Sequence, residues 1–402
     1  MNAASVPVYA RRALIVCFLV ALCEGIDLQA AGVAAAGISR EFLPTVSQKG
    51  VFFGASTFGL FLGALFGGWI ADGIGRKKVL VTSIAVFGLF SVLTAFAPGM
   101  TVLTVARLLT GLGLGGALPN LIAVAAEAST PQRRNANIVA MYVGMPLGGV
   151  IASAIILCLD VSQWRTVFIA GGVAPLLILP LMVAFMPAAA PTGHGGATSA
   201  FSPEAVRELF GAGRAARTFL LWLACFLALV ILYMMLNWLP TLLQGIGLSN
   251  REAAGAQIAF NAGGAACSVI VGRLLDSRAR MAAIVATFVA VVVALLGLAN
   301  LGSGTGSVWV LTLLLGGGVV SSQGILYGIA ADCYSAAHRG AGVGSAIALG
   351  RVGSFVGPLL AAVLVGSGRS SAQVLTNILP IVILCAVCVL YLGRRRTDVA
   401  SA

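Results

Sequence analysis

Four ionisable residues lie inside apolar stretches of the chain. Glu24 and Asp27 are three residues apart in "ALCEGIDLQAAG", while Arg107 and Arg351 each interrupt a hydrophobic run. At the centre of a membrane helix such a charge costs about 2.5–3.5 kcal/mol. These side chains are therefore expected to pair with one another or to face a wet cavity. There an acid can carry a proton and an arginine can hold a carboxylate.

The composition indicates an integral membrane protein. Of the 402 residues, 59% are hydrophobic and 9% are charged, whereas soluble proteins average about 25% charged residues. The net charge of +12 comes from basic clusters between apolar runs, which is typical of a lipid bilayer as partner and not of nucleic acid. With two histidines and cysteines mostly in apolar runs, no metal or other cofactor is expected.

Apolar runs of about 20 residues predict membrane-spanning helices. Polar breaks separate the runs, and the longest break lies near 187–216. Twelve spans are predicted, at 13–36, 50–70, 79–97, 102–126, 136–158, 165–186, 217–243, 251–272, 281–300, 307–331, 340–364 and 374–392.

The chain is therefore expected to form an N-terminal six-helix bundle (1–186), a cytoplasmic linker (187–216) and a C-terminal six-helix bundle (217–402). With both termini on one side, that side holds seventeen Lys and Arg residues and the other side five. This bias predicts cytoplasmic termini in a multi-pass protein of a bacterial inner membrane.

Repeated motifs indicate that the second bundle copies the first. "GGWIADGIGRKK" (67–78) matches "VGRLLDSRARMA" (271–282), and "AAEASTPQRR" (125–134) matches "AADCYSAAHR" (330–339). The offset is 204 or 205 residues. A parallel repeat of this kind predicts a substrate site near the membrane midplane, between the halves.

None of the four intramembrane charges is repeated. The counterpart of each is found from the offset of 205 or, for the first helix, from the match of "CFL" at 17–19 with "CFL" at 225–227. Those counterparts are Leu232 for Glu24, Met235 for Asp27, Thr312 for Arg107 and Pro146 for Arg351. Because scaffold charges would be expected in both halves, the asymmetry favours a substrate and proton site.

The loop motif "GGWIADGIGRKK" and the helix motif "RLLTGLGLGG" (107–116) resemble those of the major facilitator superfamily, with Gly73 where an arginine is usual. "EGIDLQAAG" (24–32), "MPLGG" (145–149) and "RGAGVGSAIALGRVGSFVGP" (339–358) resemble the aromatic acid:proton symporters within it. The resemblance implies an all-α protein with twelve transmembrane helices in two parallel repeats. It also implies proton-coupled uptake of an aromatic carboxylate, such as 3-(3-hydroxyphenyl)propionate, by alternating access in a monomer.

Each candidate residue has an expected role. Arg351 would hold the carboxylate, and Glu24, desolvated at mid-membrane, would carry the proton. Asp27 would pair with Arg107 at the same depth, and would either tune Glu24 or share its proton. Further residues that would line the substrate cavity, together with Arg107, are Tyr142, Tyr233, Asn237, Trp238, Asn261, Gln323 and Tyr327. Salt bridges of a cytoplasmic gate are expected from Asp72, Arg76, Glu127, Arg134, Asp276, Arg280, Asp332 and Arg339.

Several alternatives stay open at this point. The four charges could form a static salt-bridge network, and Trp238 could be an interfacial anchor. The glycines of "GLGLGG" (111–116) favour close helix packing over nucleotide binding. A membrane-embedded enzyme would need a nucleophile–base pair or metal ligands in the spans, and none is found in the sequence. Two alternatives remain. One is a channel, and the other is an exporter or symporter of a different solute, such as a benzoate-type acid, a sugar or a drug.

Overall fold

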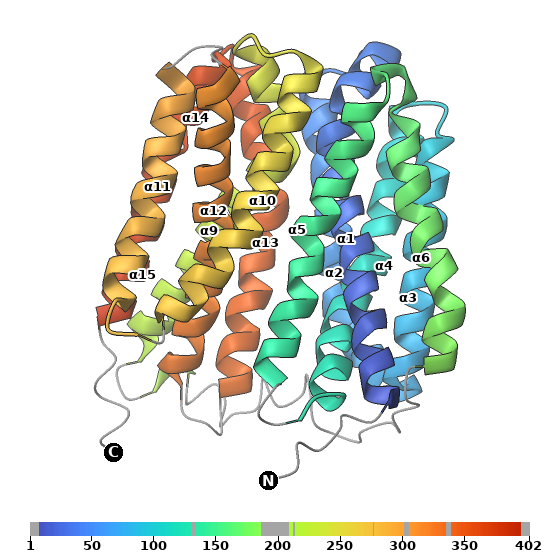
Figure 1. Ribbon diagram of the computed structural model, residues 1–402, viewed down its shortest axis with the longest axis vertical. Coiled ribbons are helices and arrows are strands. Elements are labelled where there is room, and N and C mark those ends of the chain that lie inside the picture. Colours follow the sequence, from blue (N-terminus) through green and yellow to red (C-terminus); the bar gives the residue numbers. More distant parts are fainter. Residues whose placement is uncertain are drawn as a thin grey trace. The chain divides into compact units, whose positions relative to one another are not determined.

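A computed structural model of the chain describes residues 8–130, 134–185, 209–211, 214–275, 277–300, 305–334 and 339–394. Within these ranges the regular structure is helical and contains no strand (Figure 1). In this described part of the chain, twelve helical segments are long and apolar enough to cross a membrane. The predicted all-α class and the twelve predicted spans are therefore confirmed.

The first compact unit comprises Met1–Leu43 and Ala55–Gly195. Within it, α1 packs against α5 and α6, and α3 packs against α4 and α6. Its helices are α1 (Val8–Phe42), most of α2 (Val46–Ile74), α3 (Arg76–Ala95), α4 (Met100–Glu127), α5 (Arg134–Cys158), the short 3-10 helix η1 (Val161–Gln163) and α6 (Arg165–Phe185).

The second compact unit comprises Pro44–Gly54, which includes the first turns of α2, and Gly196–Ala402. Here α10 packs against α12, and α9 packs against α13. Its helices are α9 (Ala215–Gly245), α10 (Asn250–Leu275), α11 (Arg280–Asn300), α12 (Thr305–Cys333), α13 (Arg339–Gly366), α14 (Ser371–Asn377) and α15 (Leu379–Arg394). The linker boundaries at 187 and 216 stay a prediction.

Glycines bring the main chains of neighbouring helices into direct contact. A Cβ atom added to Gly111 of α4 would collide with the main-chain oxygen of Ser56 on α2. In the second unit, a Cβ added to Gly316 of α12 would collide with the main-chain oxygen of Phe260 on α10. Gly316 comes 205 residues after Gly111, and Phe260 comes 204 residues after Ser56. The glycines of "GLGLGG" therefore serve helix packing, and the internal repeat is visible in the contacts themselves.

The same kind of contact corrects the match between the first helices of the two halves. A Cβ on Gly148 would meet the oxygen of Leu22, and one on Gly353 would meet the oxygen of Phe226. Leu22 therefore corresponds to Phe226, an offset of 204 where the "CFL" match implied 208. The match was wrong by four residues, about one helical turn, because residues one turn apart share a helix face.

With the corrected register, Ala228 is the counterpart of Glu24 and Ile231 is the counterpart of Asp27. Both counterparts are apolar, as Leu232 and Met235 were. The asymmetry of the intramembrane charges therefore survives the correction.

The last span is divided into α14 and α15 at Ile378, where a single helix over 374–392 was expected. Pro380 explains the break, because its ring has no N–H to donate and clashes with the carbonyl group four residues earlier. Ser370 and Gln373 form a capping box that begins the short helix.

Replacing Gly148 by alanine is expected to lower the free energy of unfolding by about 1–3 kcal/mol, because α1 and α5 must separate to admit the methyl group. Gly324→Ala is the matched control, since nothing lies within 4 Å of a Cβ at Gly324. Alanine there should leave stability unchanged or raise it by about 0.5–1 kcal/mol. Thermal unfolding of both variants in detergent measures the difference, and equal melting temperatures would refute the packing role.

Candidate functional site

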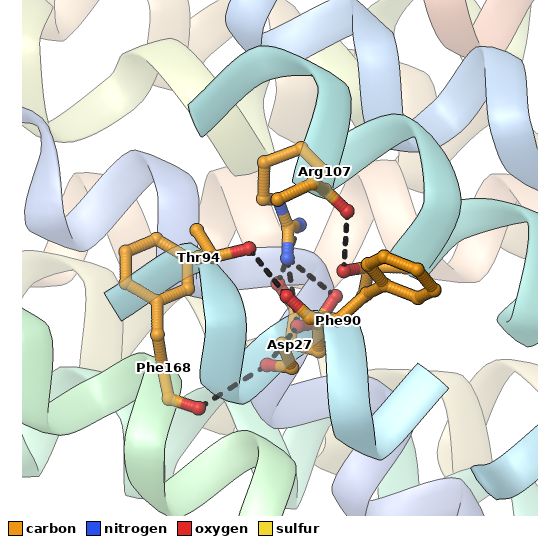
Figure 2. A network of polar contacts seen from close by, with 8 residues as sticks. Asp27, Phe90, Thr94, Arg107 and Phe168 are labelled. Carbon is orange, nitrogen blue, oxygen red and sulfur yellow. Dashed lines mark hydrogen bonds and ion pairs between the residues drawn. The ribbon is translucent and has the colours of Figure 1, made fainter. Parts of the chain in front are cut away.

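Asp27 and Arg107 form a salt bridge inside the first unit (Figure 2). Arg107 Nη1 lies 2.7 Å from both carboxylate oxygens of Asp27, and Nη2 donates to the main-chain oxygen of Asp27 at 3.0 Å. The two side chains are 1% and 0% exposed. The predicted pairing of these residues at one depth is therefore seen in the structure.

Two further helices complete the surroundings of this pair. The hydroxyl of Ser91 on α3 donates to Asp27 Oδ1 at 2.8 Å and also lies 3.2 Å from the main-chain oxygen of Phe168 on α6. The guanidinium carbon of Arg107 stands 5.5 Å from the centre of the Phe168 ring. The charges are thus surrounded by groups from α1, α3, α4 and α6, which replace the water that the bilayer lacks.

The geometry of the pair restricts what each member can do. Protonation of Asp27 would leave the Arg107 cation buried without its counter-ion, and breaking a buried pair in this way costs about 3–5 kcal/mol. Both terminal nitrogens of Arg107 are occupied by Asp27. A direct contact between Arg107 and substrate stays a prediction.

Glu24 lies one turn before Asp27 on α1 and is 1% exposed. Its neighbour Gly25 touches α5 so closely that a Cβ would collide with the main-chain oxygen of Met145. The depth and rotation of Glu24 are therefore set by the α1–α5 contact on one side and by the Asp27–Arg107 pair on the other.

Arg351 lies on α13 in the second unit, where this helix packs closely against α9. Gly350, Gly353 and Gly357 line the side of α13 that touches α9, and this close approach brings Arg351 to Tyr233. Arg351 Nη1 donates a hydrogen bond to the Tyr233 hydroxyl at 3.0 Å. The arginine is half-buried, whereas Tyr233 is 3% exposed. A guanidinium in this position, next to a phenol, suits an incoming carboxylate.

The polar side chains expected near this arginine differ in how they are satisfied. Asn237 Nδ2 donates to the main-chain oxygen of Tyr233 at 2.8 Å, one turn back on the same helix. Asn261 does the same toward Gln257 at 2.9 Å. Tyr327, on α12, is half-buried and interacts electrostatically with Arg351 and Tyr233. Gln323, one turn earlier on α12, is buried.

Of the two other expected lining residues, Tyr142 belongs to the first unit and its lining role stays a prediction, whereas Trp238 packs inside the second unit. Tyr142 is half-buried on α5 of the first unit. Trp238 is 1% exposed, its indole nitrogen donates to the oxygen of Pro358 at 3.0 Å, and its ring meets Phe53 edge-on at 5.2 Å. The alternative of an interfacial anchor is therefore wrong for Trp238, because its polar atom is satisfied inside the protein.

Among the expected gate residues, Arg280 and Asp332 form a salt bridge of 2.7 Å between the start of α11 and the end of α12. With Arg217 and Tyr391 they line a small pocket at that end of the second unit. Asp276 and the side chains of Asp72, Arg76, Glu127, Arg134 and Arg339 lie outside the described residues. The gate function stays a prediction.

Sequence reasoning missed two polar contacts. Ser91 was not singled out, although it is one of few hydroxyl residues in its span. Arg165 and Trp164, at the start of α6, both bind the carboxylate of Glu41 near the end of α1. The opposite charges of Glu41 and Arg165, at helix ends on the same predicted side of the membrane, could have indicated this contact. In the part of the chain that the structure describes, no cluster of three or more His, Cys, Asp or Glu side chains is placed to hold a metal ion.

Comparison with known proteins agrees with this architecture. The sequence pattern of the Major Facilitator Superfamily matches residues 17–358. The chain belongs to the major facilitator superfamily. It is therefore a multi-pass membrane protein of a transporter family and not an enzyme.

Two relatives of this superfamily are similar over nearly the whole chain. The 3-(3-hydroxy-phenyl)propionate transporter of Escherichia coli (strain K12) is 39% identical, covering 95% of this chain and 94% of the relative. A 4-hydroxybenzoate transporter of Pseudomonas putida is 32% identical, covering 96% and 93%.

Among solved structures, a D-xylose-proton symporter has the same major facilitator fold. It aligns with a TM-score of 0.76 at 16% identity and covers 96% of this chain and 97% of that chain.

Asp27→Leu is expected to lower the free energy of unfolding by about 3–5 kcal/mol, because it leaves Arg107 charged and buried without its partner. The double variant Asp27→Leu/Arg107→Met should recover much of this loss, since it removes both charges. Glu41→Gln is the control at a half-exposed ion pair and should cost about 1 kcal/mol or less. Arg107→Met alone gives the second single loss. If thermal unfolding showed that the double variant loses the sum of the two single losses, Asp27 and Arg107 would not be coupled.

Proposed function

We propose that this chain is a secondary active transporter that takes up an aromatic carboxylate together with protons by alternating access. The relatives named for transport of 3-(3-hydroxyphenyl)propionate and 4-hydroxybenzoate support an aromatic acid as substrate. The proposed setting is a bacterial inner membrane, with cytoplasmic termini and a monomeric protein.

One observation carries the assignment of the proton. Asp27 is bound by Arg107 and Ser91, and its carboxylate is the counter-ion of the buried Arg107 cation. Glu24 is equally buried, one turn away on the same helix face. Of the two acids, Glu24 is therefore the one whose loss of charge does not break the Asp27–Arg107 salt bridge. The proton is assigned to Glu24, and Asp27 positions it.

The anion is assigned to the second unit. Arg351 offers a guanidinium whose fork of N–H groups matches the two oxygens of a carboxylate. Its bond to the Tyr233 hydroxyl orients the fork, and the half-buried ring of Tyr327 supplies an apolar surface for an aromatic ring. This combination of one cation and two aromatic rings fits an aromatic acid better than a sugar.

The electrical work of transport supports a coupled proton. An anion that enters against an inside-negative potential requires about 2.3 kcal/mol per 100 mV. A proton that travels with a monovalent carboxylate cancels this charge. Uptake without the proton would therefore be opposed by the membrane potential.

Glu24→Gln is expected to abolish accumulation driven by a pH gradient in proteoliposomes, because glutamine cannot release a proton. Exchange of labelled for unlabelled substrate should continue, since the substrate site is intact. Glu41→Gln, the same substitution on the same helix, serves as the control and should accumulate substrate normally. Full pH-driven accumulation by the Glu24 variant would remove the proton role from this residue.

Arg351→Lys is expected to raise the KM for an aromatic acid about tenfold or more, because one charge-assisted hydrogen bond, worth about 1.5–3 kcal/mol, is lost while the charge is kept. Uptake measured over a range of substrate concentrations gives the KM. Arg369→Lys, at an exposed arginine, is the matched control and should not change the KM. An unchanged KM in the Arg351 variant would show that another group holds the carboxylate.

A further inference from the structure

A buried amide on α12 lacks a hydrogen-bond partner among the described residues. Gln323 is 9% exposed, and its Nε2 atom is buried without an acceptor. A buried polar group without a partner is costly, and in native proteins it is commonly satisfied by a water or a ligand. Gln323 is therefore a candidate for contact with a bound molecule.

Several polar side chains of the second unit are satisfied within their own helices, whereas, in the described part of the chain, Gln323 Nε2 and the hydroxyl of Ser321 on α12 are not. Asn237 and Asn261 donate from their amide nitrogens to main-chain oxygens one turn back. Ser322, beside Gln323, donates from its hydroxyl to the oxygen of Val319. These residues do not need a ligand in order to complete those bonds.

The position of Gln323 relates it to the proposed anion site. Tyr327 follows one turn later on the same face of α12 and interacts electrostatically with both Arg351 and Tyr233. α12 packs against both α9, which carries Tyr233, and α13, which carries Arg351. All these residues belong to the second compact unit. A molecule whose carboxylate binds Arg351 and whose ring lies against Tyr327 would extend toward Gln323.

We propose that Gln323 is a specificity residue that hydrogen-bonds a hydroxyl group on the ring of the substrate. The inference rests on the proposed function, because it takes the carboxylate to be held at Arg351. A phenolic oxygen accepts a bond from Nε2, and a rotated amide can instead accept the phenolic proton on its oxygen. A neutral amide suits a neutral hydroxyl, whereas a second carboxylate would bring a further charge into a buried place. The preferred substrate class is therefore the hydroxylated aromatic monocarboxylates.

The experiment compares 3-(3-hydroxyphenyl)propionate with 3-phenylpropionate, which lacks only the ring hydroxyl. Uptake of each acid is measured with the full-length protein in proteoliposomes under a pH gradient, and kcat/KM is obtained for both. The unaltered protein should prefer the hydroxylated acid about tenfold, the value of one neutral hydrogen bond in a buried site. Gln323→Leu should reduce this preference to about one, chiefly by slowing the hydroxylated acid.

Two controls keep the result specific. Gln323→Met, which retains the length of the side chain without its polar atoms, should behave like the leucine variant. Ser322→Ala removes a neighbouring hydroxyl that bonds its own helix and should keep the tenfold preference. An equal loss for both acids in the Gln323 variants would assign Gln323 a structural role and overturn the inference.

A measurement on the unaltered protein avoids any folding defect of the variants. The hydroxylated acid should raise the melting temperature in detergent more than 3-phenylpropionate does at equal concentration. If both acids were transported and stabilised the protein equally, the specificity role would fail while the proposed function stood. If neither acid were transported or stabilised the protein, both proposals would fail.

Discussion

The salt bridge between Asp27 and Arg107 is the interaction around which the first unit is arranged. In the hydrocarbon core of a bilayer no water solvates a charge, so a buried ion is stable only beside a counter-ion inside the protein. The pair is 1% and 0% exposed, and its surroundings come from α1, α3, α4 and α6. Four helices therefore have to meet at one depth and rotation. This constraint also fixes Glu24, because a rigid helix with one residue held in place carries its neighbour one turn away with it.

Close packing of the main chains makes such an arrangement attainable. Lipid tails are as apolar as leucine, so membrane helices associate through packing, for which glycines permit the closest approach. The contacts of Gly148 with Leu22 and of Gly353 with Phe226 occur at equivalent places in the two units. The packing scaffold is thus duplicated, whereas the buried charges are not. The scaffold accounts for the fold, and the departures from the repeat indicate where each unit differs in chemistry.

Much of this organisation could be predicted from the sequence because the bilayer imposes length and hydropathy on each span. The rise per residue of an α-helix gave the depths of Asp27 and Arg107 in the membrane, and their equal depth was sufficient to predict that they pair. Contacts that depend on side-chain direction were missed, such as the hydroxyl of Ser91 on Asp27 and the buried indole of Trp238. A match of three letters could not fix the register of the first helices, since a shift of one turn preserves the helix face. The main-chain contacts at Gly148 and Gly353 resolved it.

The separation of the two charges between the units has a consequence for coupling under the proposed function. Protonation of Glu24 removes one negative charge from the first unit, and a carboxylate at Arg351 adds one to the second. Either event alone changes the net charge of the loaded protein by one, so its movement in the membrane potential would be assisted or opposed by about 2.3 kcal/mol per 100 mV. Both together leave the net charge as it was. The loaded transporter can then change conformation without electrical work. The proton adds a driving force to the concentration gradient of the substrate, and this added force comes from the pH gradient alone.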